Sequence, residues 1–178
     1  MRVRTRGLVA LGAACGALML AGCGSETVAG EAEAVGAGAG EPAFSPCDDI
    51  PDEALQSLGM DPASESPDVA GVKQPGWKIC SWNEGPQFLG VFATTRSMDE
   101  VRDNKNNEDF TQVSVGDRRG MTYREVADTD RRSCDVAVES GNGVVLIQMS
   151  NLGRDPLVEE PCAAATRAAS ALLSYVPE

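Results

Sequence analysis

The chain has 178 residues with 27 acidic side chains, 15 basic ones and no histidine, which gives a formal net charge of −12. A chain of this length holds one domain with short appendages. Its acidity disfavours nucleic acid as a partner and excludes a basic patch as the means of membrane contact. Only 4% of the residues are aromatic, so the core is expected to be modest and to benefit from covalent cross-links.

Residues 1–22 have the pattern of a bacterial lipoprotein signal peptide. Three arginines within the first six residues precede an uncharged apolar run over 7–22, which is shorter than the roughly 20 residues of a spanning helix. The run ends in Leu-Ala-Gly-Cys, the pattern of a lipobox, with the cysteine at Cys23. We therefore predict cleavage before Cys23, attachment of a lipid with acyl chains such as palmitate, and anchoring to the outer side of the cell membrane. The alternative is a soluble secreted protein in which Cys23 has no such role.

Residues 23–45 are predicted to form a flexible tether. They are rich in Gly, Ala and Glu, and glycines alternate with small residues over 34–40. Neither helical nor strand periodicity is present, and the glycines disfavour a helix. About 20 such residues have a root-mean-square reach of roughly 25 Å. We therefore expect one domain, residues 46–178, to lie a short distance from the membrane.

The pattern of residues 46–178 predicts an α+β domain. In chain order the expected elements are a helix (51–58), a loop (61–76), strands (77–83 and 87–94), a helix (97–104), a loop (103–109), strands (110–115, 120–126, 133–139 and 144–150) and a final helix from about 159. Hairpin-length connections join most of the strands. We therefore expect an antiparallel sheet of about five or six strands with helices packed against it, stapled by two disulfides.

Three local signals are the strongest. Ser97 and Glu100 have the spacing of a helix capping box, and Gly141-Asn142-Gly143 is typical of a hairpin turn. The strand at 133–139 alternates cleanly, with Cys134, Val136 and Val138 inward and Asp135, Ala137 and Glu139 outward. The final helix has an inward stripe of mostly small residues: Cys162, Ala165, Thr166, Ala169, Leu172, Leu173 and Val176.

Four cysteines remain in the domain: Cys47, Cys80, Cys134 and Cys162. An even number in an exported protein indicates two disulfides, with three possible connectivities. Because Cys134 faces inward and Cys162 opens the stripe of the final helix, we favour Cys134–Cys162, which leaves Cys47–Cys80 to hold the first helix. Zinc is the rival use, but the cysteine spacings include no close pair and there is no histidine. We expect no metal and no cofactor.

The residues around these cysteines resemble the actinobacterial lipoproteins of the domain-of-unknown-function 3558 family. The shared features are Pro46-Cys47, a helix ending at Leu58-Gly59, Cys80-Ser81-Trp82, Cys134-x-Val136-x-Val138 and Cys162-x-x-Ala165. The resemblance covers nearly all of residues 46–176. It implies a lipid-anchored exported domain with no assigned activity and no catalytic residue.

No catalytic constellation is recognisable. The absence of histidine removes the commonest general base, and paired thiols are not nucleophiles. Asp128-Thr129-Asp130 is interpreted as a turn and not as a calcium site. Arg118-Arg119 and Arg131-Arg132 are expected to pair with acids of the same chain, not to form one patch. Trp82 is expected in the core, whereas Trp77, after a loop, is the candidate for an exposed contact.

These observations predict a non-enzymatic binding or interaction module of the cell envelope. Its partners are expected to be the membrane, through lipidated Cys23, and an unknown envelope protein or small ligand. One alternative is a carrier that encloses an apolar ligand between the sheet and the final helix, where Ala165, Thr166 and Ala169 leave room. The other is a cell-wall hydrolase that acts through carboxylates.

Overall fold

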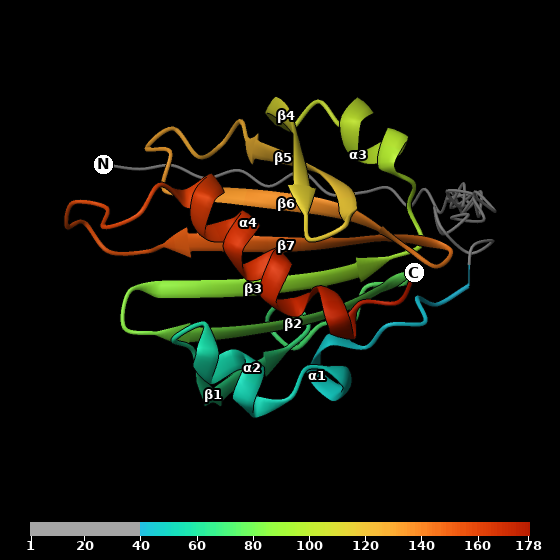
Figure 1. The fold of residues 1–178 in the computed structure, drawn as a ribbon, viewed down its shortest axis with the longest axis horizontal. Coiled ribbons are helices and arrows are strands. Elements are labelled where there is room, and N and C mark those ends of the chain that lie inside the picture. Colours follow the sequence, from blue (N-terminus) through green and yellow to red (C-terminus); the bar gives the residue numbers. More distant parts are fainter. Residues whose placement is uncertain (1–39) are drawn as a thin grey trace, which may run out of the picture. The chain divides into compact units, whose positions relative to one another are not determined.

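The structure, a computed structural model, describes residues 40–178 (Figure 1). The signal peptide, most of the tether and the lipidation site at Cys23 lie outside these residues. The strands are β1 (Asp61–Pro67), β2 (Trp77–Glu84), β3 (Gln87–Thr94), β4 (Asn107–Val115), β5 (Arg118–Glu125), β6 (Ser133–Ser140) and β7 (Gly143–Asn151). The helices are α1 (Pro46–Asp49), α2 (Asp52–Ser57), α3 (Met98–Asp103) and α4 (Pro161–Leu172), followed by the 3-10 turn η1 (Leu173–Tyr175).

The seven strands form one antiparallel sheet in the order β1-β2-β3-β7-β6-β5-β4. Five of the six connections between consecutive strands join neighbours in the sheet. The single long connection, from β3 through α3 to β4, carries the chain to the opposite edge, and β7 then returns beside β3. The predicted α+β class with an antiparallel sheet and packed helices is therefore confirmed.

The main core lies between one face of the sheet and α1, α2 and α4, which we call the α4 face. Figure 1 shows α4 crossing the middle strands obliquely. Alternate residues of β7, Val145, Ile147 and Met149, point to this core, together with the small residues Ala165 and Ala169 of α4. Because these alanines have short side chains, the helix packs close to the sheet.

A second apolar cluster occupies the opposite side of the sheet, which we call the α3 face. It contains Val101 of α3, Met121 and Tyr123 of β5, and Val144 and Leu146 of β7. The central strands are consequently covered on both faces. Several of their outward positions, such as Ala137, Val144 and Leu146, are apolar for this reason, whereas an antiparallel sheet commonly has one face exposed to water.

Local signals explain where the helices begin. Ser97 Oγ accepts the N–H of Glu100, and the Glu100 carboxylate accepts the N–H of Ser97 at 2.8 Å, so both halves of the predicted capping box are present. Helix α4 begins with Pro161, and the carboxylate of Glu160 accepts the N–H of Ala163 at 2.9 Å. The Thr166 hydroxyl donates to the carbonyl of Cys162 at 2.8 Å, which satisfies the one hydroxyl in the stripe.

The sequence prediction was wrong at three boundaries. Residues 61–67, expected as a loop, form β1, an edge strand whose pairing with β2 has a shifted register. Edge pairing needs hydrogen bonds on one side only, so a segment rich in Pro and Ser can still take part. Strand β4 begins at Asn107 within the second expected loop, and packing begins before residue 46 because Phe44 is buried in the main core. The sheet therefore has seven strands, more than expected.

The hairpin between β6 and β7 turns at Gly141-Asn142, and Gly143 already pairs with Ser140. A Cβ on residue 143 would lie 1.9 Å from the carbonyl oxygen of Thr94, so only glycine allows β3 to approach here. Among residues 40–178, no helix combines the length and the apolar character that crossing a bilayer requires.

Candidate functional site

The α3 face contains a hollow of about 660 Å³ beside α3, which we call the α3-face hollow. Its apolar and aromatic lining residues are Trp77, Phe92, Val101, Tyr123 and Leu146, and its polar ones are Arg96, Glu100, Asp103, Asn104, Asn107, Glu125, Asp135 and Gln148. A concave surface that combines apolar and aromatic side chains with converging polar groups is typical of small-molecule sites. The sheet supplies the floor of this hollow, and α3 with its flanking residues supplies one side.

Strand register builds the polar part of the floor. Gly90 of β3 pairs with Gln148 of β7, Gln148 with Asp135 of β6, and Asp135 with Tyr123 of β5. These four residues form one row across four strands. The neighbouring row, which includes Phe92 and Leu146, is apolar. The floor thus places two polar side chains and a tyrosine next to a hydrophobic strip.

Asp135 is the most unusual residue of the row. It is 4% exposed. Among residues 40–178, the only donor to its carboxylate is Gln148, whose Nε2 donates to Oδ2 at 3.3 Å. Burial, opposed by this hydrogen bond and reinforced by the charges of Glu125 and Asp128, raises the pKa of Asp135 from 3.8 to about 7. No lysine or arginine among residues 40–178 forms an ion pair with it. The hollow therefore contains a carboxyl group whose pKa is close to neutral pH.

Tyr123 stands beside Asp135 in the row and is also buried. Burial, together with the charges of Asp135 and Glu125, raises the pKa of the Tyr123 hydroxyl well above its usual value. The hydroxyl consequently stays protonated at any physiological pH. It can donate a hydrogen bond to a ligand without carrying charge.

Trp77 and Arg96 form part of the wall. The guanidinium carbon of Arg96 lies 6.0 Å from the centroid of the Trp77 ring, within the range of a cation–π contact. Arg96 also makes an exposed ion pair with Glu100 at 3.5 Å. The sequence singled out Trp77 as a contact residue, and the structure places it, half-buried, in the lining of the hollow.

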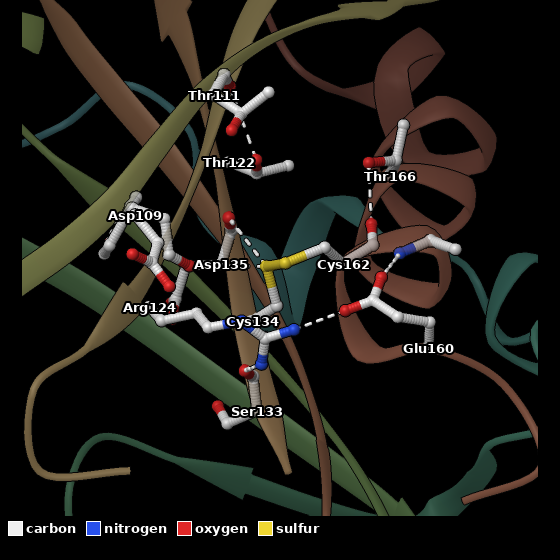
Figure 2. Close-up of a disulfide and its surroundings, with 12 residues drawn as sticks. Asp109, Thr111, Thr122, Arg124, Ser133, Cys134, Asp135, Glu160, Cys162 and Thr166 are labelled. Carbon is white, nitrogen blue, oxygen red and sulfur yellow. Dashed lines mark hydrogen bonds and ion pairs between the residues drawn. A yellow bond between two sulfur atoms is a disulfide. The ribbon is translucent and has the colours of Figure 1, made fainter. Parts of the chain in front are cut away.

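A second depression, the α4-face groove, runs between α4 and strands β4 and β5, with a volume of about 880 Å³. Figure 2 shows that the Cys134–Cys162 disulfide bridges β6 and the first turn of α4 at this groove, with Arg124 and Glu160 beside it. The Arg124 side chain is only 7% exposed and pairs with Glu160. It also donates to the carbonyls of Ser133 and Arg131.

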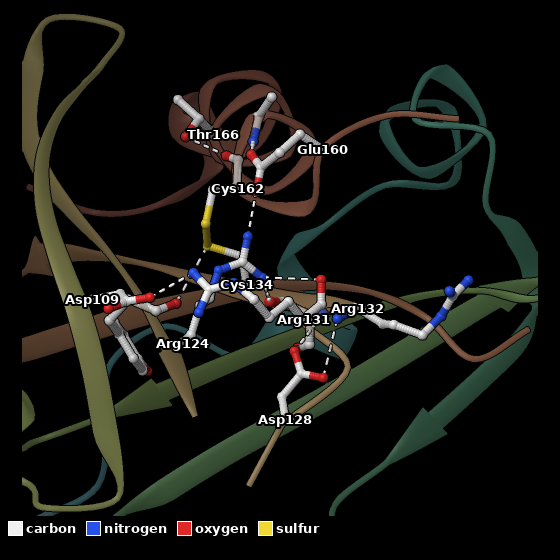
Figure 3. A network of polar contacts seen from close by, with 12 residues as sticks. Asp109, Arg124, Asp128, Arg131, Arg132, Cys134, Glu160, Cys162 and Thr166 are labelled. Atoms are coloured by element: carbon white, nitrogen blue, oxygen red, sulfur yellow. Dashed lines mark hydrogen bonds and ion pairs between the residues drawn. A yellow bond between two sulfur atoms is a disulfide. The ribbon is translucent and has the colours of Figure 1, made fainter. Parts of the chain in front are cut away.

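Figure 3 shows Arg131, which also lines this groove, beside Asp109, and Arg132, whose side chain points away from the groove. Arg131 pairs with Asp109, and Arg132 donates to the carbonyl of Asn151 at 3.0 Å. The Asp128 carboxylate accepts the backbone N–H of Arg132 and that of Ser133, which is the turn geometry the sequence predicted. These contacts hold α4 and the loop before β6 to the sheet, so we assign them a structural role.

Both disulfides join the pairs that the sequence favoured. Cys47 of α1 is bonded to Cys80 of β2, with Cα atoms 5.3 Å apart, and Cys134 to Cys162 at 4.9 Å. Glu65 lies near the first bond, and one potential ligand atom of each of the three residues falls within 4.8 Å of the others. Because both of these sulfurs are in the disulfide, they offer no thiolate to a metal.

Sequence reasoning missed the carboxyl group in the hollow. It placed Asp135 and Ala137 outward, and they do face away from α4, but both are buried because α3 and neighbouring strands cover that side. The available signal was an acid between Cys134 and Val136 in one strand, opposite Gln148, which lies between Ile147 and Met149 in the next strand. A polar pair inside two apolar strands indicates a specific hydrogen bond or a ligand contact.

The fold and the disulfides define a class of protein: a small antiparallel α+β domain that matures in an oxidising, extracytoplasmic compartment. Residues 18–175 match the family described as Protein of unknown function (DUF3558), and the chain belongs to this family. No curated protein and no solved structure matches the chain.

Proposed function

We propose that this protein is a lipid-anchored binding module of the cell envelope that takes a small ligand in the α3-face hollow. One observation carries the proposal: Asp135 is buried on the floor of this hollow without a cationic partner among the described residues. Such a group costs stability, and groups of this kind concentrate at functional sites. The adjoining Tyr123 hydroxyl and the rings of Trp77 and Phe92 supply further contacts.

The lipid anchor is supported by the sequence around Cys23, which ends an apolar export signal. The disulfides support export independently of that signal. A tether of about 20 residues with a reach of roughly 25 Å would hold the hollow close to the membrane surface, where it can meet ligands that diffuse through the envelope.

The geometry disfavours the version of the carrier hypothesis in which the ligand lies between the sheet and the final helix. Ala165 and Ala169 are buried in the main core, and of the three residues of that hypothesis only Thr166 lines an open depression, the α4-face groove. The α3-face hollow lies on the other side of the sheet. If the protein is a carrier, we propose that its cargo binds in the α3-face hollow, where Asp135 is buried without a cationic partner among the described residues.

A carboxylate-dependent hydrolase is the second candidate. Asp135, whose pKa is raised to about 7 mainly by burial, can act as a general acid, and Glu125 lines the same hollow as a possible second carboxylate. Release of cell-wall fragments by the purified protein, abolished by Asp135→Asn, would establish this activity. If the purified protein releases no fragments from wall preparations, the hydrolase hypothesis is refuted and the binding module stands as the proposed function.

Native mass spectrometry of the full-length protein, purified from its own membranes, tests the binding proposal. We expect a bound small molecule of defined mass, and we expect Trp77→Ala to reduce its occupancy. Val158→Ala is the matched control, because Val158 is exposed and lies outside the hollow. Wild-type protein without any bound small molecule, or a ligand retained equally by the Trp77→Ala variant, would contradict the proposal.

A further inference from the structure

The charges around the α3-face hollow indicate the chemical class of its ligand, and this inference rests on the proposed function. The hollow has four acidic side chains and one basic one: Glu100, Asp103, Glu125, Asp135 and Arg96. Their combined field attracts cations and repels anions. We infer that the hollow binds a small organic cation, namely an ammonium or guanidinium group carried on an apolar body.

The aromatic wall fits such a ligand. Trp77, Phe92 and Tyr123 line the hollow, and the faces of aromatic rings attract cations that lie within about 6 Å of the ring centroid. The chain itself provides an example, because the guanidinium carbon of Arg96 lies 6.0 Å from the centroid of Trp77. The Arg96 side chain is 46% exposed, so a ligand cation can displace it into solvent at little cost.

Asp135 supplies the counter-charge on the floor. A buried carboxylate without a cationic partner is unfavourable, and a ligand cation within hydrogen-bonding distance would relieve that cost. A purely apolar ligand would instead cover Asp135 and leave its second oxygen without a partner. Gln148 offers that carboxyl group only one hydrogen bond, at 3.3 Å. The floor therefore discriminates in favour of a charged donor and against a neutral lipid.

The remaining surface sets the shape of the ligand. Leu146, Val101 and Phe92 are apolar and lie beside the polar row. The volume of about 660 Å³ is within the range of pockets that enclose drug-sized molecules, roughly 300–1,000 Å³. A ligand whose cationic group contacts Asp135 and whose ring or short chain packs against Leu146 matches this arrangement of polar and apolar residues.

Binding is expected to depend on pH through Asp135. The charges of Glu125 and Asp128 act on this carboxyl, and Tyr123 lies beside it in the row. The other charged groups that line the hollow are Arg96, Glu100 and Asp103, from α3 and its approach. Because the pKa of Asp135 is about 7, ligand affinity should increase by about tenfold between pH 6 and pH 8. Protons should be released on binding near pH 7.

Three probes of nearly the same shape and different charge test the inference: 2-phenylethylamine, 2-phenylethanol and phenylacetate. They are titrated calorimetrically into the full-length protein in non-ionic detergent at pH 8. We expect the amine to bind at least tenfold more tightly than the alcohol, and phenylacetate to bind most weakly. In Asp135→Asn the amine should lose at least tenfold in affinity while the alcohol is unaffected. Glu139→Gln, which changes an exposed acid of the same strand, should leave all three affinities unchanged.

Other outcomes would overturn the inference in distinguishable ways. Equal binding of amine and alcohol, both reduced by Trp77→Ala, would leave the hollow as a binding site and refute its preference for cations. Amine binding that survives Asp135→Asn would refute the assigned role of the carboxylate. No binding of any probe at concentrations on the order of 10 mM would refute the ligand class, whereas native mass spectrometry would still decide the proposed function.

Discussion

Replacing Asp135 with Asn is expected to stabilise the protein at neutral and alkaline pH. The residue is 4% exposed, and among residues 40–178 its carboxylate accepts one hydrogen bond, from Gln148. The ionised carboxylate is largely shielded from water in this position and has no cationic partner to compensate, so its charged form is unfavourable. An amide of the same shape stays neutral at every pH, so the variant avoids this cost.

The magnitude follows from the pKa of Asp135, which burial raises from 3.8 to about 7. Between these pH values the folded protein holds a proton that the unfolded chain has lost, so wild-type stability falls as pH rises from about 4 to about 7. Above pH 7 the cost is complete. At 1.36 kcal/mol for each pKa unit, a shift of about three units corresponds to about 4 kcal/mol.

Urea unfolding of wild type and of Asp135→Asn at pH 4 and at pH 8.5 measures this effect. We expect the stability advantage of the variant to grow by about 4 kcal/mol between the two pH values. Glu139→Gln, which changes an exposed acid of the same strand, should show no such growth. An advantage for Asp135→Asn of the same size at both pH values would refute the reasoning, because it would mean that Asp135 ionises as easily in the folded protein as in the unfolded chain.

Three further predictions concern the anchor and the scaffold. Cys23→Ala should release the protein into the medium, and a variant that still sediments with membranes would contradict lipidation at this residue. Replacing Cys134 and Cys162 together with Ser should lower the free energy of unfolding by about 3 to 4 kcal/mol, because the bond closes a loop with a sequence separation of 28. Arg124→Met should cost about 2 to 3 kcal/mol in urea unfolding, because it leaves two backbone carbonyls without their donor. Arg167→Met, which breaks an exposed ion pair, should cost no more than about 1 kcal/mol. If the two arginine variants lose equal free energies of unfolding, the buried contacts of Arg124 stabilise the protein no more than an exposed ion pair does.

The pH dependence of Asp135 connects stability with the proposed function. A chain selected for stability alone would be expected to carry a neutral residue at this buried position, as the buried neighbours Cys134 and Val136 are. A group that lowers stability in the free protein and gains a partner in the bound one is expected at a binding site, where function and stability oppose each other.

The features that depend only on neighbouring residues could be predicted from the sequence. The capping box at Ser97 and Glu100 is a local hydrogen-bond pattern, and the hairpin at Gly141-Asn142 needs only a turn of the right length. The pairing of Cys134 with Cys162 could also be anticipated, because the inward faces of a strand and a helix were both readable from periodicity. These signals were enough for the fold class.

Which outward strand positions are exposed to water depends on the packing of distant segments and could not be predicted from the alternation within one strand. Asp135 and Glu139 both alternate outward on β6, yet the first is buried and the second exposed. The difference arises because α3, which precedes β6 by about 30 residues, lies beside Asp135, and because Gln148 and Tyr123 come to it from two other strands. Strand register and helix placement are long-range interactions, and alternation within one strand carries no information about what covers its outer face.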